Sequence, residues 1–237
     1  MRWKSLFVLA LLAAAALVAP AARDAVAQKK GGDLFWTAPE FSGAALRNIA
    51  LMPVVSFDSN LKNEQTVEGV VATSLKGAGH SWRSPMSVQA LLRVANAESL
   101  WKAQREVVLK NARVDSLGAA RLCAVTRTSA LLTYRIDLFE RRNLEWNEAG
   151  KPSTSVQLKA ALVDSSGRLL WTASGGETLE GQYKEANSGV VGVKGSGLGT
   201  QPLTGLSGAP VFEEVLQKLL ERWAPRFPAK TAAPAAP

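Results

Sequence analysis

The amino-acid sequence predicts a single α/β domain in which helices flank a mixed β-sheet. The chain of 237 residues is 47% hydrophobic, which suffices for a sizeable core and is too apolar for an intrinsically disordered protein. The apolar spacing changes between the periods of strands and helices in the order β, α, β, α, α, β, β, β, α. The last three strands are joined by short polar segments, which predicts an antiparallel meander at the C-terminal side of the sheet.

Residues 1–27 have the layout of a secretory signal peptide. Arg2 and Lys4 form a basic start, residues 6–19 are an apolar run, and Ala27 ends a small-x-small cleavage site. The run is shorter than the roughly 20 residues that a membrane-spanning helix needs. We therefore expect cleavage and export, with the mature protein either periplasmic or secreted and with association with the outer membrane as a further option.

The mature chain begins with an expected flexible leader, residues 28–44, which three aromatic side chains tether to the domain spanning 45–228. These aromatics are Phe35, Trp36 and Phe41. The β-branched, apolar run 48–57 predicts a buried strand. Pro53 lies inside this run and indicates either an edge strand or the end of the strand, because proline has no N–H for the sheet.

Helical spacing starts at Asn63, and a short strand at 80–83 precedes a second helical region that opens at Pro85. Asn96 is expected to be the N-cap of the next helix, and a further short helix follows Asp115. The positions expected on common helical faces are Val67, Val70 and Val71, then Leu100, Trp101, Gln104, Val107 and Val108, then Leu117, Ala120, Arg121 and Ala124.

The predicted meander comprises strands at 129–141, 155–164 and 168–174, with a tight turn at 164–167 where glycine supplies a positive φ. Leu132, Tyr134, Ile136 and Leu138 alternate with Thr133, Arg135 and Asp137, and in the second strand Gln157 and Lys159 lie opposite the apolar positions. A final amphipathic helix contains Phe212, Val215, Leu216, Leu219, Leu220 and Trp223.

Residues 181–208 hold eight of the 19 glycines and predict an unusually long loop. Its spacing of Gly192, Gly195, Gly197 and Gly199 matches neither a phosphate-binding loop nor a dinucleotide fingerprint. The loop is either a mobile surface segment or one that becomes ordered on binding a partner or membrane. The Ala/Pro-rich tail, residues 229–237, is expected to be disordered.

Residues suited to catalysis or metal binding are scarce. His80 and Cys123 are the only histidine and cysteine, which excludes a Cys/His zinc site and a disulfide framework. We expect His80 to be a surface or capped residue, and Cys123 a buried inert thiol or, alternatively, a free thiol open to oxidation. Two S-x-x-K matches, at Ser59 and Ser99, lack the partner motifs of penicillin-recognising enzymes. The sequence thus predicts no catalytic, cofactor-binding or metal residues, although it does not exclude a pair of carboxylates.

The charge balance points to anionic partners. The full chain carries 28 basic and 20 acidic residues, and loss of residues 1–27 removes three of the former and one of the latter, leaving a net charge of +6. Such a surplus favours an anionic membrane, a cell-wall polymer or an acidic protein. The basic residues form no run of five, and export makes nucleic acid an unsuitable partner.

Five segments give the chain a characteristic order of a first strand, a helix, a further strand, a hairpin and a closing amphipathic helix. In sequence they are NIALMPVVSF, VEGVVATSL, ALLTYRIDLF, SVQLKAALVDSSGRLLWTASG and APVFEEVLQKLLERWAPRFP. This pattern resembles the bacterial envelope family that includes the curli-secretion lipoprotein, the lipoprotein activators of penicillin-binding proteins and the N-terminal domain of TolB. Its hallmark hairpin corresponds to Val156–Trp171, and the resemblance covers Asn48–Pro228. It implies an anticodon-binding-like α/β fold, a non-enzymatic envelope role and no catalytic residues. The secretion and activator proteins are anchored through an N-terminal cysteine, so the position of Cys123 predicts no lipid anchor of that kind.

Three functions compete at this stage. The first is a non-enzymatic exported envelope protein, an assembly or regulatory interaction module in envelope biogenesis or secretion, with an envelope protein as partner. The second is a subunit of an oligomeric secretion channel, which requires a homo-oligomer. The third is an exported carboxylate-dependent hydrolase, which requires a pocket with two carboxylates about 5 to 10 Å apart.

Overall fold

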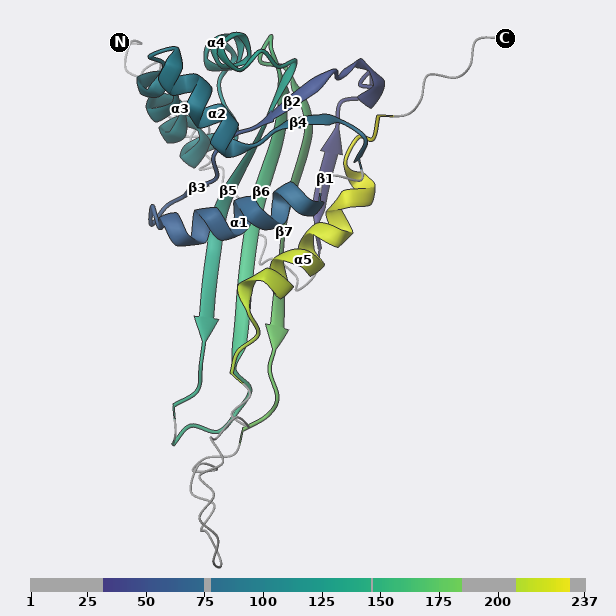
Figure 1. Cartoon of the computed structure of the whole chain (residues 1–237). Coiled ribbons are helices and arrows are strands. Elements are labelled where there is room, and N and C mark those ends of the chain that lie inside the picture. The colour runs from purple at the N-terminus through teal and green to yellow at the C-terminus, as the bar shows by residue number, and fades with distance from the viewer. Residues whose placement is uncertain (1–31, 75–77, 146, 185–207, 231–237) are drawn as a thin grey trace, which may run out of the picture. The chain divides into compact units, whose positions relative to one another are not determined.

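The computed structural model describes residues 32–74, 78–145, 147–184 and 208–230 (Figure 1). The chain divides into two units, residues 1–30 and 31–237, and the description below concerns the second. The predicted signal peptide, most of the Gly-rich loop and most of the tail lie outside the described residues. Within the described ranges, no helix combines the length and the apolar character needed to cross a bilayer.

The sheet is mixed and has seven strands in the order β1-β7-β6-β5-β2-β4, with β3 also paired to β5. The strands are β1 (Leu34–Thr37), β2 (Asn48–Leu51), β3 (Val55–Ser56), β4 (Ser81–Arg83), β5 (Ala130–Arg142), β6 (Ser153–Asp164) and β7 (Leu169–Glu180). Strands β2 and β3 run parallel to β5, and β4 runs parallel to β2. The β5–β6–β7 pairs are antiparallel, which confirms the predicted meander and the mixed α/β fold class.

Helices cover both faces of this sheet. They are α1 (Leu61–Ser74), α2 (Pro85–Val94), α3 (Glu98–Asn111), α4 (Ser116–Thr126) and α5 (Phe212–Trp223). Helices α1 and α5 lie across one face and share a core with alternate residues of β5 and β6, while α2, α3 and α4 gather on the other face near the start of β5 (Figure 1). Residues Leu132 and Tyr134 face α1 and α5, and Leu131 faces the other helices, as strand alternation requires.

The apolar run 48–57 forms two short strands instead of one. Strand β2 ends at Leu51, and Pro53 lies in the break before β3, which confirms the expectation that proline ends the strand. Outside regular pairing, the Met52 N–H donates to the Leu132 carbonyl at 2.9 Å and the Val54 N–H donates to the Glu68 carboxylate at 3.0 Å. The break therefore keeps its buried backbone donors satisfied.

Two details of the predicted helices were wrong. Asn96 is not the N-cap of α3, because Ala97 occupies that position and Asn96 holds a left-handed φ of 52° in the connection from α2. Asn tolerates this conformation better than most residues, which explains why it is found there.

In α4, the positions expected to share a face are all exposed, and the buried positions are Gly118, Ala119, Leu122, Cys123 and Thr126. Asp115 does cap the helix, accepting from the Gly118 N–H at 2.6 Å. Gly118 lies so close to the side chain of Gln104 that a Cβ would overlap it, so close packing against α3 selects this face.

The expected leader, residues 28–44, contains part of the sheet. Residues 34–37 form β1 and pair antiparallel with β7, so this part is not a flexible leader. The Phe35 ring packs edge-to-face on Trp223 of α5 at a centroid distance of 6.3 Å, and Phe41 also packs against the core. The anchoring by aromatics was thus correctly anticipated, and burial of Phe35 explains why the segment joins the sheet.

Candidate functional site

The helices α2, α3 and α4 leave part of their face of the sheet uncovered. They pack on residues of β2, β3, β5 and the end of β6, and Leu169 at the start of β7 is the last sheet residue that packs against their cluster in the described part of the chain. Leu34 and Trp36 of the edge strand β1 point to this side and remain 67% and 46% exposed. We define the open face as six residues on this side of the sheet, of which Ala161 alone is buried: Leu34, Trp36, Lys159, Ala161, Thr172 and Ser174.

The register of the sheet brings these positions together in two rows. Lys159 of β6 pairs with Ser174 of β7, which pairs with Leu34 of β1. In the adjacent row, Ala161 pairs with Thr172, which pairs with Trp36. Paired residues in a sheet point to the same side, so small side chains form the floor between a lysine and an aromatic edge.

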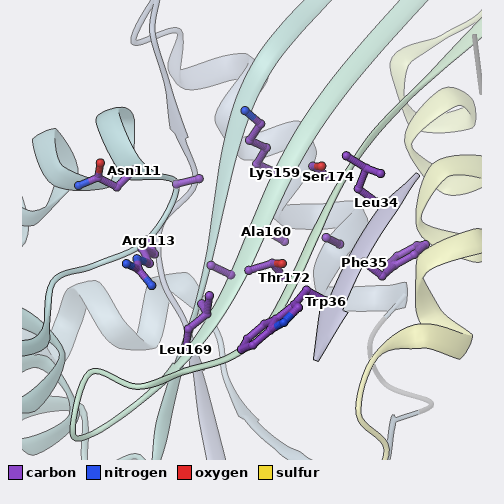
Figure 2. A pocket seen from close by; sticks show the side chains of 13 residues that line it. Leu34, Phe35, Trp36, Asn111, Arg113, Lys159, Ala160, Leu169, Thr172 and Ser174 are labelled. Atoms are coloured by element: carbon purple, nitrogen blue, oxygen red, sulfur yellow. The ribbon is translucent and has the colours of Figure 1, made fainter. Parts of the chain in front are cut away.

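A hollow of about 530 Å³ lies over this floor. Figure 2 shows Leu34 and Trp36 on one side of it and Asn111 and Arg113, which follow the end of α3, on the other. The small side chains of Ala161, Thr172 and Ser174 leave the space between these walls free.

Hydrogen bonds from β5 hold the wall formed by Asn111 and Arg113. Arg135 donates through Nη1 to the Leu109 carbonyl at 2.8 Å, and Thr133 donates through Oγ1 to the Ala112 carbonyl at 3.2 Å. Ala112 has a left-handed φ of 58°, as often occurs where a helix ends. The end of α3 is thereby fixed over the sheet.

The electrostatics of this region are cationic. Arg135 donates to Asp137 at 2.6 Å, and Lys159 lies 3.3 Å from the other oxygen of the same carboxylate. Arg113 makes no ion pair with any described residue. Asp137 therefore offsets one of three cations, and an excess of positive charge remains beside the hollow.

His80 is buried, not a surface residue. Its Nε2 lies 2.7 Å from the Pro228 carbonyl, and its ring packs edge-to-face on Trp82 and Phe227. The ring thus contacts both the segment after α5 and the edge strand β4. The prediction of a surface residue was wrong because the C-terminal segment covers this position, whereas the alternative of a capped histidine matches its hydrogen bond.

Cys123 is buried in the core between the sheet and the α2–α4 layer. Burial raises the pKa of its thiol to about 11, and this outweighs a hydrogen bond with Thr128 that lowers it. A thiol with such a pKa holds little thiolate at neutral pH, so the structure matches the prediction of an inert thiol.

The S-x-x-K matches form no nucleophile. Ser59 accepts a long hydrogen bond from Arg105 at 3.4 Å, and Ser99 and Lys102 are exposed on α3. The glycines of the predicted loop, Gly192, Gly195, Gly197 and Gly199, lie outside the described residues.

Carboxylates occur close together on α1, where Glu64 and Glu68 are one helical turn apart. Glu68 accepts the Val54 N–H of the strand break, Glu64 accepts the Ser56 N–H of β3, and Glu64 also pairs with Arg105 at 2.6 Å. Burial raises the pKa of Glu68, opposed by the Val54 N–H and assisted by the charge of Glu64. Their hydrogen bonds fit a structural role at the break.

A second hollow, of about 410 Å³, lies between α1 and α5 and includes Glu213 and Glu221. Eight residues along a helix correspond to an axial rise of about 12 Å, beyond the range for paired catalytic carboxylates. Among the described residues, no group of three or more His, Cys, Asp or Glu side chains is placed to hold a metal ion.

The sequence pointed to some members of the open face but not to the hollow. Lys159 was correctly placed opposite the apolar positions of its strand, and Trp36 was interpreted only as a tether. Asn111 and Arg113 carried no recognisable signal, because their position depends on where α3 ends over the sheet. The alternation of small and polar residues along 155–164 and 168–174 was the available clue to a thinly covered face.

No family model and no curated protein matches the chain. Among solved structures, the chain is similar to the lipoprotein GNA1162 from Neisseria meningitidis, with a TM-score of 0.43 and 17% identity over 56% of this chain and 83% of that chain. It is also similar to the PelC dodecamer from Paraburkholderia phytofirmans, with a TM-score of 0.42 and 14% identity over 82% of this chain and 95% of that chain. At TM-scores this low, the similarities do not establish a family, and nothing that these proteins do is carried over.

Proposed function

We propose that the protein is a non-enzymatic exported envelope protein that acts as an assembly or regulatory interaction module. The observation that supports this role is the open face, where an exposed tryptophan and an excess of positive charge border a hollow of about 530 Å³. The export signal in residues 1–27 supports the location. The proposed partner is an envelope protein, and the basic balance also suits contact with an anionic membrane or cell-wall surface.

The composition of the hollow supports binding over chemistry. Its ionisable side chains are Lys159 and Arg113; Lys159 forms an ion pair with Asp137 at 3.3 Å, and among the described residues no hydrogen bond joins Lys159 to a hydroxyl that it could activate as a nucleophile. Exposed aromatic and arginine side chains are the types most enriched at protein interfaces. The hydrolase alternative has less support, because the carboxylates of buried Glu64 and half-buried Glu68 accept hydrogen bonds from backbone donors.

The secretion-channel alternative depends on self-association. It would place the open face, or another surface, between copies of the chain. Light scattering can measure the mass of the mature protein over a hundredfold range of concentration. This measurement distinguishes a self-associating channel subunit from a module that binds a different protein. A discrete oligomer at every concentration would favour the channel.

Site-specific photo-crosslinking in the native host tests the proposal. Benzoylphenylalanine replaces Trp36 in one strain and Val94, an exposed residue of α2 away from the hollow, in another. We expect crosslinks to an envelope component from position 36 and none to the same component from position 94. Cell fractionation and mass spectrometry should find a mature chain beginning at Gln28 outside the cytoplasm. A full-length cytoplasmic protein, or equal crosslinking from both positions, would contradict the proposal.

A further inference from the structure

We propose that the hollow of the open face binds an extended peptide segment of a partner protein, in which an apolar residue and an acidic residue lie two positions apart. This inference rests on the proposed function and specifies its ligand. The observation that supports it is that Trp36 and Lys159 lie on opposite sides of a floor of small side chains (Figure 2).

The apolar half of the ligand site is the side of the hollow formed by β1. Leu34 and Trp36 are 67% and 46% exposed although their neighbour Phe35 is packed into the core. Exposure of two large apolar side chains on one strand is costly unless a partner covers them. An aliphatic or aromatic side chain of a peptide would bury this surface.

The polar half of the site is cationic. Lys159 is 44% exposed and shares the carboxylate of Asp137 with Arg135, while Arg113 borders the same hollow without an ion pair among the described residues. A carboxylate on the ligand would therefore meet two cations whose charge the protein itself leaves largely uncompensated. Charge complementarity accordingly favours an acidic residue at this end.

The sheet geometry sets the spacing between the two halves. Lys159 and Leu34 lie on β6 and β1, two strand spacings apart, because β7 lies between them. Two spacings equal about 10 Å. An extended chain rises about 3.3 Å per residue and its alternate side chains point the same way, so side chains two residues apart span most of this distance, and the length of the Lys159 side chain covers the remainder.

A peptide is the occupant that these features favour. Thr172 and Ser174 on the floor and Asn111 on the wall offer donors and acceptors at intervals across the hollow. An extended backbone presents N–H and C=O groups along its whole length and would use them. A flat membrane surface would not enter a hollow that is walled on two sides.

Selection of binders from a random dodecapeptide phage library tests the inference. The mature wild-type protein is the target, and the Trp36→Thr, Lys159→Gln double variant is the counter-target. Threonine retains the strand propensity of β1, and glutamine leaves Asp137 paired with Arg135. We expect enrichment of peptides that carry an apolar residue and an acidic residue two positions apart.

Affinities of the selected peptides, measured by fluorescence anisotropy, provide the second readout. Lys159→Gln should weaken binding by about 5- to 10-fold, the range for a partly exposed charge-assisted contact. Lys151→Gln is the matched control, since it removes an exposed lysine in the connection between β5 and β6 that pairs with Glu180 instead. The control should change affinity by less than about twofold, and raising the salt concentration should weaken the wild-type complex. Circular dichroism establishes that each variant remains folded.

Three outcomes would overturn the inference: no enriched peptide, enriched peptides without the acidic residue, or equal affinity for the double variant. Crosslinking at Trp36 in cells distinguishes failure of the peptide inference from failure of the proposed interaction function. A crosslinked envelope protein that lacks such a segment, or a crosslinked polysaccharide or lipid, would leave the open face as a binding surface and refute the peptide ligand.

Discussion

The buried ion pair between Glu64 and Arg105 permits a quantitative test of what fixes α1 and α3 beside the strand break. Glu64 is 4% exposed, and its Oε1 accepts from the Ser56 N–H at 3.0 Å, the Ser56 hydroxyl at 2.8 Å and Arg105 at 2.6 Å. Arg105→Met keeps the aliphatic length of the side chain and removes its charge. The carboxylate then loses its only ionic partner among the described residues while remaining buried.

The expected loss follows from the exposure of the two partners. Breaking a fully buried pair costs about 3–5 kcal/mol, and breaking an exposed pair costs about 0.2–1 kcal/mol. The side chain of Glu64 is 5% exposed and that of Arg105 is 24% exposed, so this pair lies between the two limits. We expect Arg105→Met to lower the free energy of unfolding by about 2 kcal/mol. In a Glu64→Gln background, Arg105→Met leaves no unpaired buried charge, so it should cost only about 0.5 kcal/mol.

Urea unfolding of the mature protein, followed by tryptophan fluorescence and circular dichroism, measures the four corners of this double-mutant cycle. Arg93→Met is the control, because its ion pair with Glu98 is exposed on both sides and should contribute within about 0.5 kcal/mol. The reasoning would be refuted by an Arg105→Met cost below about 0.5 kcal/mol, or by the same cost with and without the Glu64 carboxylate.

Three further predictions concern the turn, the thiol and a helix cap. Gly167→Ala should lower the free energy of unfolding by about 2 kcal/mol or more, because Gly167 has a φ of +84° and a Cβ there would overlap the start of α4. Cys123, whose pKa burial raises to about 11, should resist a thiol-specific reagent at pH 8 in the folded protein and react on unfolding in urea. Asp115→Ala should cost about 1 kcal/mol at pH 7 by removing the cap of α4. The side chain of Gln104 and then the Gly118 N–H hold the pKa of Asp115 below its ordinary 3.8, so this stabilisation is present above that pH and is lost as the pH falls below it.

A control or a contradicting result accompanies each of the predictions for Gly167, Cys123 and Asp115. Gly69→Ala, where a methyl group has open space on α1, should raise stability by about 0.5–1 kcal/mol, and an equal loss at both glycines would exclude a local cause at Gly167. Labelling of native Cys123 at the rate of the unfolded chain would show that the thiol is accessible. A deficit in Asp115→Ala that stays constant down to pH 2.5 would show that the ionised carboxylate is not its source, whereas Asp115→Asn should retain the cap at pH 7.

Most of the secondary structure could be predicted because its signals are local. The alternation of Leu132, Tyr134 and Ile136 with Thr133 and Arg135 depends only on the two-residue period of a strand, and the structure confirms it. The spacing of the last helix and the glycine of the β6–β7 turn are equally local, and both were correct.

The errors over α4, residues 34–37 and His80 share one cause, which is packing between elements distant in sequence. Leu117 is exposed because close contact between Gly118 and Gln104 of α3 turns a different face of α4 inward. Residues 34–37 form a strand because β7, more than 130 positions later, offers an edge and Trp223 offers a surface for Phe35. No window of the sequence contains both partners of such contacts.

The sequence by itself determined the antiparallel meander, the last helix and the mixed α/β class, since their periods can be read along the chain. The tertiary structure alone decided that α2, α3 and α4 stop short of β7 and β1, and that Trp36, Lys159 and Arg113 border one hollow. Which part of a sheet stays uncovered depends on where helices come to rest in space, and that is a property of long-range packing that the local pattern does not encode.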